Sequence, residues 1–234
     1  MMISTKTQNV EMNTKIIWYE KTVEYAFVRK FLETAAMPLS GPAEKVGDTI
    51  FNEGNSFFII EFKKGIKKNL NGSLSDLSNQ VEQEKKKYVD INTTMANMSN
   101  YSAYFCHYAV YGIYDEKEKD SNEKFKLAFI NYLDFIKTDS NNNTQPKILS
   151  DLSELKRISN LTEFKKYLQF LINSKKVING SSSSVDYGNT LIVDKHGTAC
   201  ALSDREGLEE LGLKFPTNEP SSDEPSSDYS CGMQ

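Results

Sequence analysis

Two acidic residues and a lysine in the first third of the chain have the types and spacing of a hydrolytic metal centre. Asp48 is followed by a twelve-residue spacer, Glu61 and, two positions later, Lys63. One or two carboxylates usually hold Mg²⁺ in proteins, and waters and substrate phosphates supply its remaining ligands. The bound ion polarises a phosphate and lowers the pKa of a coordinated water. A nearby lysine can orient that water or stabilise charge building on the phosphate.

The segment that carries these residues is predicted to be a β-hairpin. A short strand over 48–51, a four-residue loop over 53–56 and a longer strand over 57–63 pair Asn52 with Phe57 and place Asp48 directly opposite Glu61. Opposed residues have Cβ atoms roughly 4.5–5.5 Å apart, where two carboxylates repel each other unless a cation lies between them. Alternation along the strand puts Glu61 and Lys63 on one face. The register therefore predicts a cation site shared by the two acids.

Flanking segments must position this hairpin. Apolar residues at steps of three and four predict a helix over 15–33 and another, with a weaker stripe, over 74–88. Residues 65–71 are expected to form a basic loop. Residues 102–115 are rich in aromatic and β-branched side chains and carry no charge before their last position, as in a buried central strand.

The second half is predicted to add helices and a hairpin. Residues 124–136 fit a strand or a helix equally well, and residues 148–173 predict one or two amphipathic helices, divided near Asn160. A second hairpin, turning at residues 195–197, is expected before a short helix over 204–211. The last segment repeats EPSSD at 219–223 and 224–228 and is expected to be disordered.

The order helix, acid-bearing hairpin, helix and buried strand resembles the core of the PD-(D/E)XK nuclease superfamily. Asp48 matches the first acid of the motif, and Glu61-Phe62-Lys63 matches (D/E)XK, although Gly47 stands where the motif has proline. The resemblance covers residues 15–115. It implies an α/β fold of the restriction-endonuclease type, in which helices flank a central mixed sheet, with C-terminal helical and hairpin additions and a disordered acidic tail.

The same resemblance implies roles for further residues. Glu24, or Glu20, would complete the metal shell of Asp48 and Glu61 from the preceding helix, and Gln80 or Gln83 would be accessory residues on the following helix. The cofactor would be Mg²⁺ or Mn²⁺. The expected activity is hydrolysis of phosphodiester bonds by an endonuclease, with DNA the expected substrate.

Lysines near the motif are candidates for contacts with a nucleic-acid backbone. They are Lys64, Lys67, Lys68, Lys85, Lys86 and Lys87. The net charge of −4 does not argue against such a ligand, because four acidic residues and no basic ones lie in the last sixteen positions. A homodimer and a protein partner for the acidic tail are further expectations. The alternative function is a catalytically inactive nuclease-fold protein that binds protein or nucleic acid.

Composition sets the remaining limits. The chain of 234 residues, 38% of them hydrophobic, can bury one sizeable core. Its apolar runs are shorter than the roughly 18 residues of a membrane span, and its start lacks the features of a secretory signal. We therefore expect a cytoplasmic protein that does not enter the membrane. The 3 cysteines and 2 histidines do not predict a disulfide framework or a zinc site, and His107 is expected in the core.

Three parts are predicted along the chain. Residues 1–178 form the nuclease-like domain. Residues 179–213 form a hairpin and helix that either stand apart or belong to that domain. Residues 214–234 form the disordered acidic tail.

Overall fold

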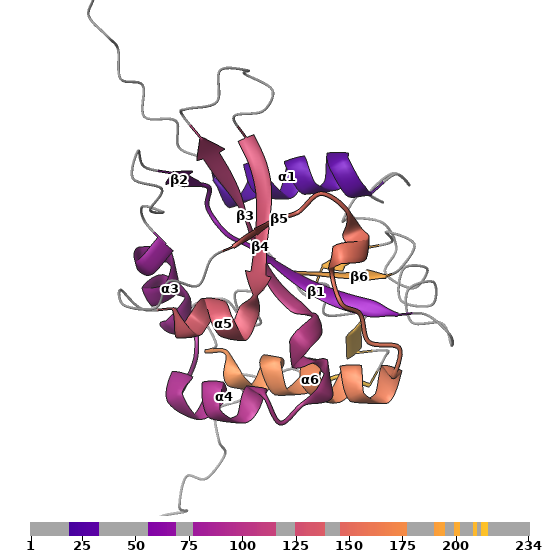
Figure 1. Ribbon diagram of the computed structural model, residues 1–234. Coiled ribbons are helices and arrows are strands. Elements are labelled where there is room, and N and C mark those ends of the chain that lie inside the picture. The colour runs from indigo at the N-terminus through magenta and orange to yellow at the C-terminus, as the bar shows by residue number, and fades with distance from the viewer. Residues whose placement is uncertain are drawn as a thin grey trace, which may run out of the picture.

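A mixed β-sheet with helices on both faces forms the centre of the protein (Figure 1). The computed structural model describes residues 19–32, 56–68, 77–115, 125–138, 146–176, 190–194, 199–201, 208–209 and 212–214. The α/β class and the central mixed sheet flanked by helices, both predicted from the sequence, are confirmed. Asp48, the first predicted strand and the acidic tail beyond Lys214 lie outside the described residues.

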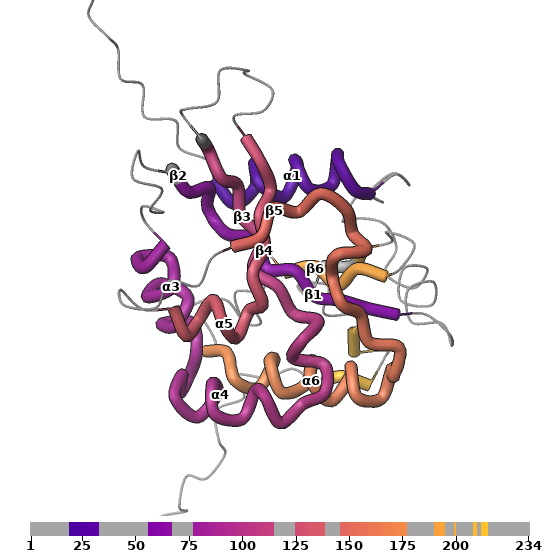
Figure 2. Tube along the Cα trace, viewed as in Figure 1, coloured from indigo at the N-terminus to yellow at the C-terminus, as the bar shows by residue number. Residues whose placement is uncertain are grey.

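Seven described strands belong to one sheet, in the order β5-β4-β3-β1-β6-β7, and β2 also pairs with β3. Their bounds are β1 Phe57–Phe62, β2 Ile66–Lys68, β3 His107–Asp115, β4 Phe125–Asn131, β5 Lys147–Ile148, β6 Thr190–Asp194 and β7 Ala199–Ala201. Strands β1 and β2 run parallel to β3, whereas the other neighbouring pairs are antiparallel. The path between these strands can be followed in Figure 2.

Strand β2 continues β1 along the same edge of β3 after a one-residue bulge. Three residues separate Phe62 from Ile66, but only two separate their partners Val110 and Ile113. The Lys63 N–H still donates to the Val110 carbonyl oxygen at 2.8 Å. A bulge of this kind bends a strand and redirects the side chains beside it. Part of the expected basic loop over 65–71 is therefore a strand.

Both edges of β1 are occupied at Glu61. Ala109 of β3 lies opposite Glu61 on one side, and Thr190 of β6 lies opposite it on the other. A strand has only two edges, so the predicted hairpin register, in which Glu61 pairs with Asp48, is wrong. The β6–β7 hairpin takes one of these edges, and the segment predicted as an appendage thus contributes to the central sheet.

Helices cover the two faces of the sheet. On one face lies α1, Glu20–Phe31, whose Phe27 ring is 5.5 Å from the Phe62 ring. On the other face lies α6, Leu161–Ser174, whose Phe164 ring stacks 5.1 Å from the Phe57 ring. Side chains at odd and even positions of a strand point to opposite faces. The side chain of Glu61 therefore points to the α6 face.

The described residues also contain three shorter α-helices and two 3₁₀ helices. Between β2 and β3 the chain forms α3, Leu77–Lys85, then α4, Ile91–Met98, and the 3₁₀ helix η1, Ser102–Cys106. The ambiguous segment over 124–136 contains both structures, because β4 runs directly into α5, Tyr132–Lys137. A second 3₁₀ helix, η2, spans Leu152–Glu154.

One other boundary agrees with a local sequence signal, and another differs from its prediction. Helix α6 begins directly after Asn160, whose side chain accepts a hydrogen bond from the Glu163 N–H at 3.1 Å, as an N-cap residue does. The predicted strand over 102–115 is regular only from His107 onward. Within the short helix predicted over 204–211, Leu208 and Glu209 are helical.

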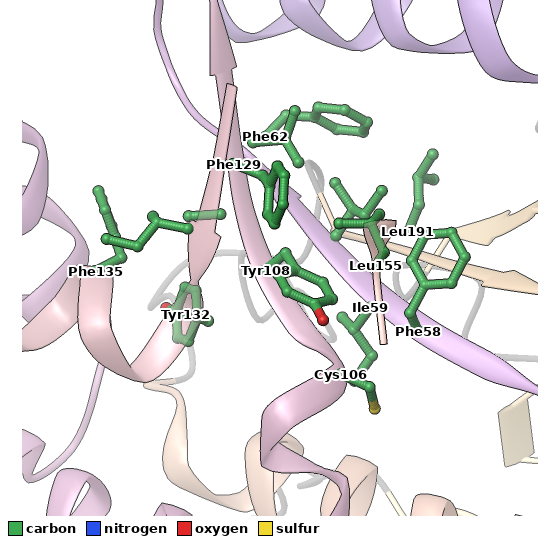
Figure 3. Packing of buried hydrophobic residues seen from close by; sticks show 14 of the residues in the cluster. Phe58, Ile59, Phe62, Cys106, Tyr108, Phe129, Tyr132, Phe135, Leu155 and Leu191 are labelled. Carbon is green, nitrogen blue, oxygen red and sulfur yellow. The ribbon is translucent and has the colours of Figure 1, made fainter. Parts of the chain in front are cut away.

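The apolar part of β1 lies at the centre of the core. Its apolar residues are at most 1% exposed, and they are Phe57, Phe58, Ile59, Ile60 and Phe62. Figure 3 shows buried side chains around this strand, including Tyr108 of the neighbouring strand β3 and Phe129 of β4, the next strand beyond it. Burial on both faces is typical of a strand whose sheet is covered by helices on each side.

Gly112 of β3 provides a test of this packing. A methyl group added there would overlap the ring of Phe125 on β4. We expect Gly112→Ala to lower the free energy of unfolding by about 1–3 kcal/mol, as overpacking does. Urea denaturation measures this loss. The loss should shrink when Phe125→Leu is also present, and an equal loss in both backgrounds would contradict the assigned contact.

Candidate functional site

Glu61 lies at the end of β1 with both carboxylate oxygens bound by lysines. Lys63 Nζ donates to Oε2 at 2.9 Å, and Lys175 Nζ donates to Oε1 at 2.8 Å. All three side chains are buried, with 2–3% of each residue exposed. One carboxylate is therefore held between two ammonium groups inside the protein.

A second acid, Glu84 on α3, completes this arrangement. Lys63 Nζ also donates to Glu84 Oε2, and the Tyr132 hydroxyl donates to Glu84 Oε1 at 2.8 Å. The hydroxyls of Tyr88 and Tyr132 lie 2.6 Å apart. Lys63 thus bridges two carboxylates, one from the central strand and one from the helix that follows it.

His107, at the start of β3, faces the same carboxylate. Its Nδ1 lies 2.9 Å from the Tyr167 hydroxyl, and its ring stacks on Tyr132 with centroids 4.0 Å apart. Its Nε2 lies 3.6 Å from Glu61 Oε1, beyond hydrogen-bond distance. The expected core histidine is thus buried and also borders the charged group. We call Glu61, Lys63, Glu84, His107 and Lys175 the Glu61 cluster.

Ion pairs keep Glu61 and Lys63 ionised although both are buried. Burial acts to raise the pKa of Glu61, but Lys175 and Lys63 hold that pKa well below its usual range. Burial acts to lower the pKa of Lys63, but Glu61 and Glu84 raise it above its usual range. Each carboxylate of the cluster therefore lies against ammonium groups, since Lys63 and Lys175 contact Glu61, and Lys63 and Lys87 contact Glu84.

The same buried environment keeps His107, Tyr88 and Tyr132 uncharged. Burial lowers the pKa of His107, and the opposing effect of Glu61 does not restore it. Burial, together with Glu61 and Glu84, raises the pKa of Tyr88 and of Tyr132 well above 10.0. Near neutral pH the imidazole is uncharged and the phenols keep their protons, so they can donate hydrogen bonds.

Lys175 reaches the cluster from the end of α6, where its backbone is anchored. Tyr88 and Lys175 form an isolated antiparallel bridge. On its two sides, the Val89 N–H donates to the Ser174 carbonyl oxygen at 2.9 Å, and the Lys176 N–H donates to the Lys87 carbonyl oxygen at 2.8 Å. This bridge ties the end of α6 to the segment directly after α3.

The structure brings together only part of the predicted site. Glu61 and Lys63 are adjacent, and Asp48 lies outside the described residues. Glu24 is buried on α1, where it accepts a hydrogen bond from Lys21 at 2.7 Å, and half-buried Glu20 lies on the same helix. Because α1 covers the face that carries Phe62, Glu24 and Glu20 lie across the sheet from the side chain of Glu61.

The predicted accessory glutamines lie on α3 but outside the Glu61 cluster. Gln80 donates to the Lys64 carbonyl oxygen at 3.1 Å, and Gln83 is exposed. Gln80 therefore supports the bulge that follows Lys63 and does not contact a carboxylate of the cluster.

The predicted backbone-binding lysines lie near one another along the chain but differ in their contacts. Lys64 and Lys86 are exposed. Lys85 pairs with Glu82 at 2.8 Å, and Lys87 Nζ lies 3.3 Å from the buried Glu84. Lys67 and Lys68 belong to β2, and their side chains lie outside the description.

Sequence reasoning missed two members of the Glu61 cluster. Glu84 had a signal, because it occupies the apolar stripe of its helix between Val81 and Tyr88. A charged residue at such a position must find a partner when the stripe is buried. Lys175 had no signal, since its contact with Glu61 joins residues 114 positions apart.

Comparison with protein families, with curated proteins and with solved structures gives no match to this chain. Among the described residues, no three His, Cys, Asp or Glu side chains are grouped so that they could hold a metal ion. In the same part of the chain, no helix has the length and apolar character needed to span a membrane.

The lowered pKa of His107 predicts a pH dependence of stability. Between pH 6.5 and the lower pKa of the folded state, the unfolded chain binds more protons, so stability falls as pH falls. We expect urea denaturation at pH 7.5 and 5.5 to show this loss, which for one histidine is at most about 1.4 kcal/mol per pH unit. His107→Gln should reduce the loss and His196→Gln should not. Equal losses in wild type and His107→Gln would contradict the burial of a neutral imidazole.

Proposed function

We propose that the protein is a nuclease that hydrolyses phosphodiester bonds of nucleic acid, with DNA as substrate and Mg²⁺ or Mn²⁺ as the implied cofactor. The observation that carries the proposal is the Glu61–Lys63 pair, 2.9 Å apart at the end of a central strand. That strand leads through α3 and α4 to a parallel neighbour, β3. This order supports the resemblance to the PD-(D/E)XK superfamily.

Lys63 is the residue best suited to act on a phosphate. Two carboxylates keep its ammonium group charged, and the same contacts fix its direction. A fixed cation beside a phosphate stabilises the negative charge that develops as a nucleophile attacks. Glu61 and Glu84 are then positioning residues for Lys63.

The implied divalent ion does not fit the described residues as they stand. Carboxylate oxygens are suitable ligands for Mg²⁺. However, Lys63 and Lys175 already bind the two oxygens of Glu61, and Glu24 and Glu20 lie on the opposite face. An ion at Glu61 would have to displace an ammonium group. The predicted partner, Asp48, lies outside the described residues.

A second candidate function follows from this closed arrangement. A buried cluster of ion pairs can also serve only to join β1, α3 and α6, which favours a nuclease-fold protein that binds without cleaving. In that case the exposed Lys64 and Lys86 would contribute to binding through the phosphate backbone, and affinity would fall steeply as salt rises.

Cleavage assays on plasmid and single-stranded DNA distinguish the two functions. We expect the wild type to cleave with Mg²⁺ or Mn²⁺, to stop with EDTA, and to lose about 100-fold or more in rate on Lys63→Met. Asp48→Ala should also lose activity, whereas Lys176→Met, which changes an exposed lysine, should not.

Circular dichroism of each variant establishes that it is folded. A folded wild type without cleavage under either metal, or unchanged cleavage by folded Lys63→Met, would refute the nuclease proposal. Salt-sensitive DNA binding without cleavage would favour the second candidate.

A further inference from the structure

We propose that Lys175 is a built-in cation that keeps divalent metal ions from Glu61, so that a metal can bind this carboxylate only when the ammonium group of Lys175 is removed or displaced. The implication for regulation rests on the nuclease function proposed above. The claim about metal binding rests on the geometry of the Glu61 cluster alone.

Lys175 occupies the side of Glu61 that Lys63 leaves free. Lys63 donates to Oε2 and Lys175 donates to Oε1, at 2.9 and 2.8 Å. The imidazole of His107 borders Oε1 as well, at 3.6 Å. A metal ion that binds Glu61 must share an oxygen with an ammonium group or replace one.

Net charge makes sharing unfavourable. Both carboxylates of the cluster already lie against ammonium groups, because Lys63 and Lys175 contact Glu61, and Lys63 and Lys87 contact Glu84. A divalent ion would add two uncompensated positive charges to a buried site, where like charges repel much more strongly than in water. Without Lys175, Glu61 Oε1 loses its ammonium partner and can accept a cation in its place.

The backbone anchors Lys175 in this position. Hydrogen bonds on both sides of the Tyr88–Lys175 bridge hold the end of α6 against the segment after α3. The ammonium group also lies 5.9 Å from the centre of the Tyr88 ring. Displacing Lys175 thus requires a change at this bridge or a rotation of a buried side chain.

A purely structural ion pair predicts a different result from a metal-excluding one. If Lys175 only joins α6 to β1, replacing it by a neutral residue lowers stability and creates no metal affinity. If Lys175 takes the place of a metal, the same replacement creates a cation site that depends on Glu61. Metal binding, not activity, separates these cases.

The test is a titration of the full chain with Mn²⁺. Binding is measured by isothermal titration calorimetry and by the electron paramagnetic resonance signal of free Mn²⁺. We expect Lys175→Met to bind one Mn²⁺ at least tenfold more tightly than the wild type. The gain should vanish in Lys175→Met/Glu61→Gln. Lys176→Met is the matched control, since it removes a neighbouring exposed lysine, and Lys175→Arg keeps the charge; neither should show a gain.

Several outcomes would overturn the proposal. They are a folded Lys175→Met without increased Mn²⁺ affinity, a gain that survives Glu61→Gln, and an equal gain in Lys175→Arg.

If Lys175→Met does not fold, Mn²⁺ binding by the wild type is compared with Mn²⁺ binding by Glu61→Gln. Equal Mn²⁺ binding by these two proteins supports exclusion of metal from Glu61, and a wild-type site that Glu61→Gln removes contradicts it. Metal binding by Lys175→Met without DNA cleavage would support the role of Lys175 and count against the nuclease.

Discussion

The buried carboxylate of Glu61, held between two lysines, is the interaction on which the rest of the site depends. Removing a charge from water costs several kcal/mol unless partners replace its hydration. Lys63, from the end of β1, and Lys175, from the end of α6, are the partners of Glu61. Glu84, from α3, is a second partner of Lys63. Replacing any one of them would take an ionic partner from a buried charge, so these elements constrain one another.

The sheet explains why the carboxylate lies so deep. β1 has neighbours on both edges at Glu61, and its apolar residues pack under helices on both faces. The bulge between Phe62 and Ile66 changes the direction of the side chains that follow β1, while the backbone continues along β3 as β2. A polar side chain at the end of such a strand has no access to bulk water and must be satisfied by the protein. The Glu61–Lys63 motif is therefore part of a charge network that crosses from the sheet to two helices.

Local patterns predicted much of the fold. The apolar run before Glu61, the aromatic strand β3 and the Asn160 cap each carry their own signal within a few residues. The pairing of β1 could not be predicted in this way, because its neighbours, β3 and β6, are distant in sequence and the nearer segment over 48–51 also fits the pattern of a partner strand. In the site, too, residues with a local signal could be predicted and residues joined only by the tertiary fold could not. Glu61 and Lys63 share a face by strand alternation, Glu84 could be suspected from its place in an apolar stripe, and Lys175 depends wholly on tertiary structure.

The central claim is that ammonium groups, and not a divalent ion, neutralise Glu61. A crystal structure of the wild type grown with Mn²⁺, with data collected for the anomalous signal of manganese, tests it most directly. The account predicts no anomalous peak at Glu61 and hydrogen bonds from Lys63 and Lys175 to its two oxygens. A manganese peak within coordination distance of Glu61, with Lys175 turned away, would contradict it.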